Sequence, residues 1–172
     1  TRIIEDRWEE GNPLGNLGNS FCSLGDYKRA LKYHSQRLKI AEEIKDKLGE
    51  SHALTNLGNA YQKVGLYDKA ISYCDRGLKA SRSIGDRRGE GNALQYLGNV
   101  YMCLHQNNSA FEKFNASLKI FREIQLLPNQ IRSLKSLVEV SKRLRDSARE
   151  REFSDEMLEK SEKLKISLVK KL

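Results

Sequence analysis

Asparagines recur between positions 12 and 99 at spacings that place them on one face of successive helices. Within each segment they are three, four or seven residues apart, as expected for one side of an α-helix. A side-chain amide offers both a hydrogen-bond donor and an acceptor, so it can hold the backbone of an extended peptide whatever the peptide's side chains are. The spacing predicts a peptide-binding column made of Asn12, Asn16, Asn19, Asn56, Asn59, Asn92 and Asn99.

The same asparagines could instead join neighbouring helices to each other. In that alternative the amides hydrogen-bond across the helices and form a structural ladder without any ligand. Asparagine is a mediocre helix former, so a column of asparagines inside helices needs some compensating role. The sequence alone leaves both roles open.

Cationic side chains fall on the same predicted face as the asparagines. They include Lys63, Arg132 and Arg143, and only one acidic residue shares the face. Because arginine pairs with carboxylates through two parallel hydrogen bonds, this face is expected to favour an acidic ligand. Tyr96 interrupts the asparagine column, where it either anchors an apolar group of the ligand or fills space.

Apart from one weak cysteine–histidine pair, no set of residues has the spacing of a catalytic or metal site. The glycines fall inside predicted helices and not in strand-to-helix turns, so no phosphate-binding loop is expected. His34 matches Cys74 and Phe114 at an inward position, which favours a core histidine over a general base. The cysteines show no CxxC pair, which is typical of free thiols in a reducing compartment, and Cys103 with His105 is a weak zinc pair. We expect no enzyme, no cofactor and no metal site.

A unit of 40 residues repeats through the chain and must position these side chains. In each unit apolar residues follow one another at steps of three and four, which predicts two α-helices, and a glycine between them predicts the turn. A fourth, degraded copy follows the three clear ones. The matching columns include Leu17/Leu57/Leu97, Gly18/Gly58/Gly98, Asn19/Asn59/Asn99, Phe21/Tyr61/Tyr101 and Ala30/Ala70/Ala110.

A helix pair cannot bury both of its apolar stripes alone, so neighbouring pairs must stack and share a core. The expected fold is all-α, a right-handed α-solenoid of stacked antiparallel helix pairs whose first helices form the concave surface. A glycine inside a helix costs about 1 kcal/mol relative to alanine, so Gly58 and its counterparts imply a close approach of two backbones. Ala70 and its counterparts are the expected opposing wall.

The spacing predicts a single array over residues 1–172, with about four repeats and a last helix that caps the stack. The first helix is expected to start near Asn12 or to kink there, because Pro13 would disrupt a helix interior. A capping box is predicted at Ser147-Ala148-Arg149-Glu150. The predicted repeats are 7–44, 47–84, 87–125 and 130–170, with helices near 13–24, 27–44, 47–64, 67–84, 87–104, 107–125, 130–145 and 147–170.

The first ten residues match the junction between two later repeats. The chain is therefore expected to be a fragment of a longer array, or an array whose first helix is missing. If its N-terminus exposes Ile3, Ile4 and Trp8, copies of the chain can pair end to end, because unprotected terminal repeats favour association.

The repeat resembles the tetratricopeptide repeat, whose first helix carries Leu-Gly and then an aromatic residue, as in Leu57-Gly58…Tyr61, and whose second helix carries a small residue, here Ala70. The 40-residue unit and the segment GDRRGEGNALQYLGNVY are similar to the G-protein-signalling modulator adaptors of the Partner of Inscuteable type. This resemblance implies peptide binding through asparagines at the positions of Asn19, Asn59 and Asn99.

Composition limits the partners further. The net charge is +8, but basic residues alternate with acidic ones along the helices without an aromatic stacking platform, so nucleic acid is not an expected partner. No apolar run reaches the roughly 18 residues of a membrane span, and the acidic N-terminus is unlike a secretory signal. The sequence predicts a cytoplasmic adaptor or scaffold that binds an extended acidic segment of another protein. The alternative is a scaffold that self-associates end to end and carries a purely structural asparagine ladder.

Overall fold

The computed structural model describes residues 2–169, with side chains over residues 10–166. This part of the chain contains only α-helices joined by short turns, as predicted, and none of the helices is long and apolar enough to cross a membrane. The helices are α1 (Arg2–Ser23), α2 (Tyr27–Glu43), α3 (Lys47–Lys63), α4 (Tyr67–Ser83), α5 (Arg87–Cys103), α6 (Asn107–Glu123), α7 (Leu127–Leu144) and α8 (Ser147–Val169).

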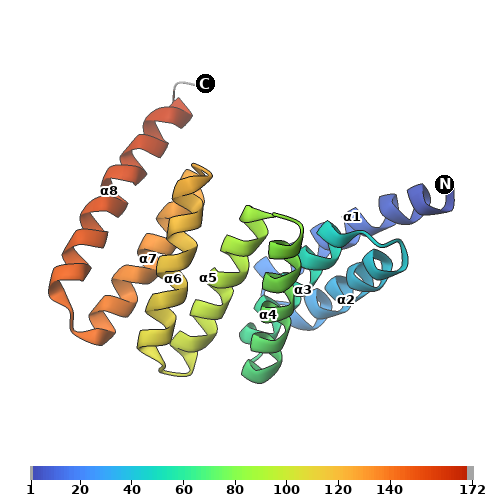
Figure 1. The fold of residues 1–172 in the computed structure, drawn as a ribbon, viewed down its shortest axis with the longest axis horizontal. Coiled ribbons are helices and arrows are strands. Elements are labelled where there is room, and N and C mark those ends of the chain that lie inside the picture. Colours follow the sequence, from blue (N-terminus) through green and yellow to red (C-terminus); the bar gives the residue numbers. More distant parts are fainter. Residues whose placement is uncertain (1, 170–172) are drawn as a thin grey trace.

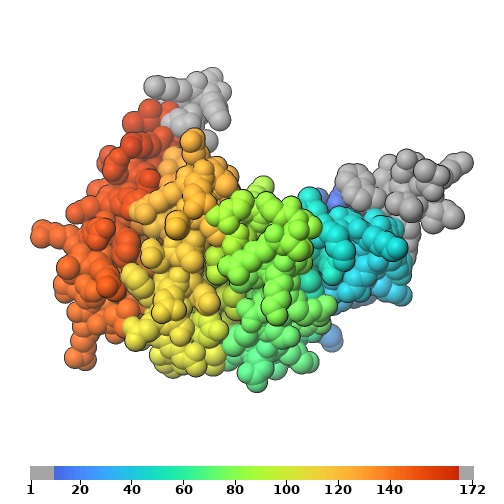
Figure 2. Space-filling model, in the orientation of Figure 1, coloured from blue at the N-terminus to red at the C-terminus, as the bar shows by residue number. Residues whose placement is uncertain are grey.

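The helices stack in chain order. Each one packs against the next in sequence, and the first helices of neighbouring pairs also touch, α1 with α3 and α3 with α5. Figure 1 shows this row, with α1 and α8 at opposite ends of the molecule. Figure 2 shows the same order as successive bands across the surface. The predicted α-solenoid is confirmed.

The turns recur at an interval half the length of the repeat. From α2 to α8 each helix begins 20 residues after the one before it. Every turn contains one residue with a left-handed backbone, and Gly25 and Gly65 take this conformation as the sequence predicted. Four turns use other residues, which a search for glycine cannot find. The left-handed positions are Gly25, Lys45, Gly65, Gly85, His105, Gln125 and Arg145.

Aspartates cap the helices that follow several of these turns. The Asp46 and Asp86 carboxylates each accept a hydrogen bond of 2.9 Å from a glycine backbone N–H in the first turn of α3 or α5. The capping box predicted at Ser147 is wrong by one residue. Asp146 accepts the hydrogen bond from the Arg149 N–H, at 3.0 Å, and so caps α8.

Two predicted helix starts are also wrong, both near a proline. Helix α1 begins at Arg2, well ahead of Pro13, and continues through the proline. The part of the helix that precedes Pro13 still packs on α2, because Gly11 lies against the Arg37 guanidinium. Helix α7 begins three residues earlier than predicted, with Pro128 in its first turn. Proline is favoured there because its missing N–H would have no partner inside the helix. The side chains of residues 1–9 and 167–172 lie outside the described residues, and with them the predicted exposure of Ile3, Ile4 and Trp8.

Gly58 lets α3 and α4 approach closely. A Cβ atom on Gly58 would lie 2.2 Å from Cys74 Sγ, 3.0 Å from the Cys74 backbone N and 3.1 Å from the Ala70 carbonyl oxygen. The predicted close approach is therefore confirmed, but the opposing wall is chiefly Cys74, with Ala70 contributing its backbone. The same contact joins Gly18 to His34 and Gly98 to Phe114.

We expect Gly58→Ala to lower the free energy of unfolding by about 1–3 kcal/mol, because two backbone atoms and a sulfur must move aside. Gly15→Ala is the matched control, since a Cβ on Gly15 would meet nothing within 4 Å. This control should raise the free energy of unfolding by about 0.5–1 kcal/mol, the usual gain of alanine over glycine in a helix. Urea unfolding measures both, and shifts of the same sign would show that α3 and α4 are not closely packed at Gly58.

His34 is a core residue, as the sequence predicted. Its side chain is buried against Gly18, and Nδ1 has no hydrogen-bond partner in the described part of the chain. Burial disfavours the charged imidazolium and lowers the pKa of His34 to about 4. His34 is therefore neutral near pH 7 and lies in the core.

The depressed pKa of His34 predicts a loss of stability in acid. Between the ordinary histidine pKa of 6.5 and the folded value of about 4, the unfolded chain binds a proton that the folded chain does not. Stability should therefore fall as the pH drops through this window, by up to about 3 kcal/mol from His34 alone. His34→Cys, which copies Cys74 of the next repeat, should make the dependence shallower. Urea unfolding at pH 7 and pH 4.5 compares the two proteins, and equal pH dependence would contradict this assignment.

Candidate functional site

The first helices of the four pairs line one groove with a volume of about 660 Å³. The helical period turns the asparagines of α1, α3 and α5 toward the same side of the stack, and α7 closes the groove with a cation. Seven of the predicted site residues line it together: Asn19, Asn56, Asn59, Lys63, Asn92, Tyr96 and Arg132.

The groove crosses the helices diagonally. It meets α1 near its C-terminal end, at Asn19 and Ser23, and runs along α3 from His52 to Lys63. On α5 and α7 it meets the N-terminal halves of the helices. A ligand that fills the groove therefore contacts all four pairs at different heights.

A second hollow of about 340 Å³ adjoins the groove, and Lys63 lines both. Asn99 lies in this second hollow, together with Lys135 and Glu139. The structure thus places Asn59 and Asn99 in neighbouring depressions that are joined at Lys63.

Three predicted site residues line neither depression. Asn16 is exposed on α1, which the groove meets only farther along. The Asn12 Oδ1 atom accepts a hydrogen bond of 3.3 Å from Arg37, so it joins α1 to α2. Arg143 donates to the Met102 carbonyl oxygen at 3.2 Å and joins α7 to α5.

The side-chain amides of Asn19, Asn56 and Asn99 make no hydrogen bond to other described residues. Asn59 makes one, from Nδ2 to the Cys22 sulfur at 3.6 Å, and sulfur is a weak acceptor. Most of the donor and acceptor capacity of this column therefore faces solvent.

Asn92 differs, because its oxygen is already occupied. Its Oδ1 accepts hydrogen bonds of 2.7 Å from Arg132 and 3.2 Å from Asn129, both on α7. The Arg132 guanidinium also lies 5.8 Å above the Phe121 ring. Burial raises the pKa of Tyr96, an effect that Arg132 opposes, so the tyrosine remains a neutral phenol beside this arginine.

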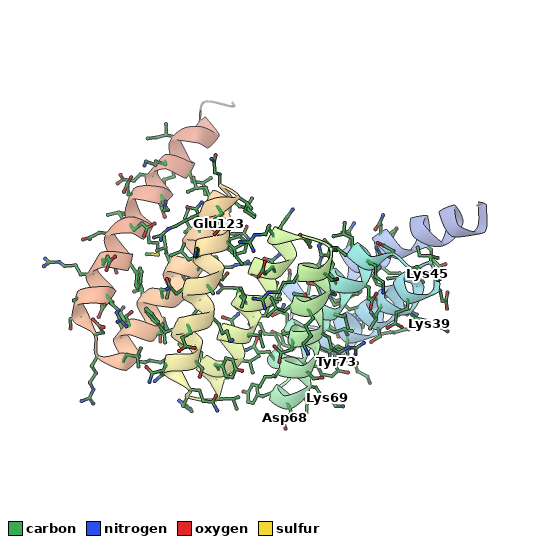
Figure 3. All side chains as sticks on the ribbon, in the orientation of Figure 1. Lys39, Lys45, Asp68, Lys69, Tyr73 and Glu123 are labelled. Carbon is green, nitrogen blue, oxygen red and sulfur yellow. The ribbon has the colours of Figure 1, made fainter. Side chains whose placement is uncertain are left out.

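The groove has a positive electrostatic character. Lys63, Arg88 and Arg132 line it, and none of the described residues that line it is acidic. His52 also lines it, with Nε2 at 2.9 Å from an Asp86 carboxylate oxygen. The outer helices differ, since charges of both signs are exposed there, including Lys39, Lys69 and Glu123, which Figure 3 labels on α2, α4 and α6.

Sequence reasoning missed Arg88 and Asn129, which both line the groove. Arg88 lies one helical turn before Asn92, so the spacing could have revealed it. Asn129 was missed because α7 was expected to begin at residue 130, one residue too late to include it.

Burial protects two of the cysteine thiols, Cys22 and Cys74. No three His, Cys, Asp or Glu residues gather to hold a metal ion within the described part of the chain. Burial raises the pKa of the Cys22 thiol in the groove, and it raises that of Cys74 in the core to about 12. Both therefore remain protonated thiols at neutral pH, and neither is activated as a nucleophile.

The tetratricopeptide repeat family matches residues 9–73 and 49–123, which together span more than half of the chain. No curated protein matches the sequence.

Several solved structures share the fold at low sequence identity. Aspartyl phosphate phosphatase F from Bacillus subtilis superposes with a TM-score of 0.85 and 16% identity, over 92% of this chain and 42% of its own. A Rap protein complexed with competence and sporulation factor gives a TM-score of 0.85 and 16% identity, over 89% of this chain and 43% of its own. BtubC from P. vanneervenii gives a TM-score of 0.76 and 17% identity, over 94% of this chain and 70% of its own. The chain spans less than half the length of the first two proteins.

Proposed function

This chain belongs to the tetratricopeptide repeat family, and from that premise we propose that its groove binds an extended segment of another protein. One observation carries the proposal: the amides of Asn19, Asn56 and Asn99 line the two depressions without a hydrogen bond to the described chain. Such amides suit a peptide backbone, which presents a donor and an acceptor at nearly every residue. A Rap protein of similar fold has been solved in complex with a factor, which supports the use of this architecture for binding.

The segment is acidic in this proposal. Lys63, Arg88 and Arg132 line the groove without an acidic neighbour among its walls, so they attract carboxylates and disfavour a basic segment. Arg132 is held in place by Asn92, which limits the entropy that the arginine loses when it binds a carboxylate.

The biological role that fits such binding is that of a cytoplasmic adaptor or scaffold without catalytic activity. The 40-residue repeat and the register of Asn19, Asn59 and Asn99 support a relation to the G-protein-signalling modulator adaptors of the Partner of Inscuteable type.

A structural ladder is the second candidate for the asparagines. It is favoured by one contact, the hydrogen bond of 3.2 Å between Asn129 and Asn92, which joins α7 to α5. In that case the chain acts as a scaffold that associates through its ends, and the groove has no peptide ligand.

The acidic-ligand proposal predicts charge-dependent association. A fluorescent, unstructured peptide rich in glutamate should bind, whereas the same peptide with glutamine at each glutamate should bind at least about tenfold more weakly at low salt. Arg88→Glu should slow association and reduce its salt dependence, because it reverses a steering charge on the groove wall. Arg151→Glu is the control, with the same charge change on the exposed surface of α8. Stopped-flow fluorescence measures the rates, and equal effects of the two substitutions would contradict binding in the groove.

A further inference from the structure

An apolar hollow lies at the turn between α1 and α2, facing the end of α3. It has a volume of about 530 Å³ and is lined by Leu24, Tyr27 and Val64 together with charged residues of the turn. Leu24 is 78% exposed and Val64 is 41% exposed, which is unusual for large apolar side chains beside each other on a charged surface. The hollow is shallow and open to solvent, so it suits one side chain and not an enclosed small molecule.

The hollow and the groove are lined by residues that follow each other directly in sequence at two places. The wall of the groove ends on α1 at Ser23 and on α3 at Lys63. The wall of the hollow starts at the next residue on both sides, Leu24 and Val64. A segment that extends from the groove past the C-terminal ends of α1 and α3 would meet Leu24 and Val64 next along the chain.

This position of the repeat is apolar throughout, but it is most exposed in the first two repeats. Leu24 and Val64 occupy the same position in the 40-residue unit, and their counterpart in the third repeat, Leu104, is only partly exposed. Gly25 has a φ of 79°, so the chain turns immediately after Leu24. The helix packing of the stack does not require Leu24 to be apolar, because most of its surface is in solvent.

The charges around the hollow indicate which part of a ligand it faces. Asp26 is paired with Arg29 at 2.5 Å, which leaves Lys28 at the hollow and Lys63 at the adjoining groove as the neighbouring cations. An apolar ligand residue in the hollow would thus be flanked by acidic ligand residues, and those would continue toward Arg88 and Arg132.

We propose that the hollow binds an apolar side chain of the same segment that fills the groove. The ligand is then bipartite, with an acidic stretch along α3, α5 and α7 and a large apolar residue at the ends of α1 and α3. This inference rests on the proposed function and adds to it a second binding site and a sequence requirement for the partner.

The test compares peptides on the intact chain. One peptide carries the acidic stretch alone, and others add one leucine at either end through short glycine–serine spacers of increasing length. Leu24→Asn combined with Val64→Thr removes the apolar hollow at exposed positions. Leu48→Asn is the control, since Leu48 is 49% exposed on α3 and lines neither the groove nor the hollow.

At one spacer length the added leucine should tighten binding to the unmodified chain by about tenfold, as burial of part of a leucine side chain does. The double variant should lose this gain while it binds the purely acidic peptide as before, and Leu48→Asn should keep the gain. If leucine adds no affinity at any spacer length, or if the gain survives in the double variant, the hollow is not a ligand site, although the groove proposal stands. If neither peptide binds the unmodified chain, both proposals are wrong.

Discussion

Replacement of Asp46 by alanine is expected to lower the free energy of unfolding by about 3–5 kcal/mol, because it leaves a buried charge without its partner. The Arg37 side chain is only 9% exposed, and its Nη2 atom lies 2.7 Å from an Asp46 carboxylate oxygen. Gly11 of α1 and Gly49 of α3 enclose the guanidinium so closely that a Cβ atom on either would clash with it. The guanidinium is therefore enclosed between α1 and α3.

Asp86→Ala is the control that measures the loss of a helix cap without the loss of a buried ion pair. Asp86 caps α5 as Asp46 caps α3, with a hydrogen bond of 2.9 Å from a backbone N–H, but it pairs with the exposed His52 and not with a buried arginine. Its replacement should cost about 1 kcal/mol, the usual effect of a lost cap. Urea unfolding of both variants decides the matter, and equal losses would mean that the Arg37–Asp46 pair contributes no stability beyond the cap.

Replacement of Asn19, Asn59 and Asn99 together by alanine should weaken binding of an acidic peptide by about 1.5–4.5 kcal/mol, if three neutral hydrogen bonds add. The stability of the chain should change little, because only Asn59 hydrogen-bonds to a described residue, through a weak sulfur acceptor. Calorimetric titration gives the affinity, and urea unfolding gives the stability.

A matched variant with Asn108→Ala and Asn115→Ala controls for the loss of asparagines as such, since both are exposed on α6. It should bind the peptide normally. Unfolding of the triple variant would show that the column is a structural ladder. A folded triple variant that binds as well as the original chain would place the ligand elsewhere.

The repeated helix pairs could be predicted because apolar residues at steps of three and four report directly on helix burial. The start of α1 could not be predicted, because proline normally disrupts a helix interior and so weighs against a helix through Pro13. In the structure the helix includes residues before Pro13, and Gly11 there packs on Arg37 of α2. The sequence also did not predict the left-handed turn residues Lys45, His105, Gln125 and Arg145. Their left-handed backbone is imposed by the helix packing on residues that do not prefer it.

The asparagines of α3 line the groove, whereas Asn12 and Asn16 do not. Their spacing along α1 is right, but the groove crosses the helices diagonally and meets only the end of α1. Such an angle depends on how successive pairs stack, which a one-dimensional pattern does not contain. Arg143 shows the same limit, since its guanidinium donates a hydrogen bond to the Met102 carbonyl oxygen of α5 and does not line the groove.

Peptide binding in the groove can be tested most directly by the NMR signals of the asparagine side-chain amides during titration with the acidic peptide. Hydrogen bonding to the ligand should shift the signals of Asn19, Asn59 and Asn99, which line the two depressions. Asn108 and Asn115, exposed on α6, should keep their positions in the same spectrum. Saturable shifts confined to the first group are the predicted result; shifts confined to α6, or none in the groove while the peptide is bound, would contradict it.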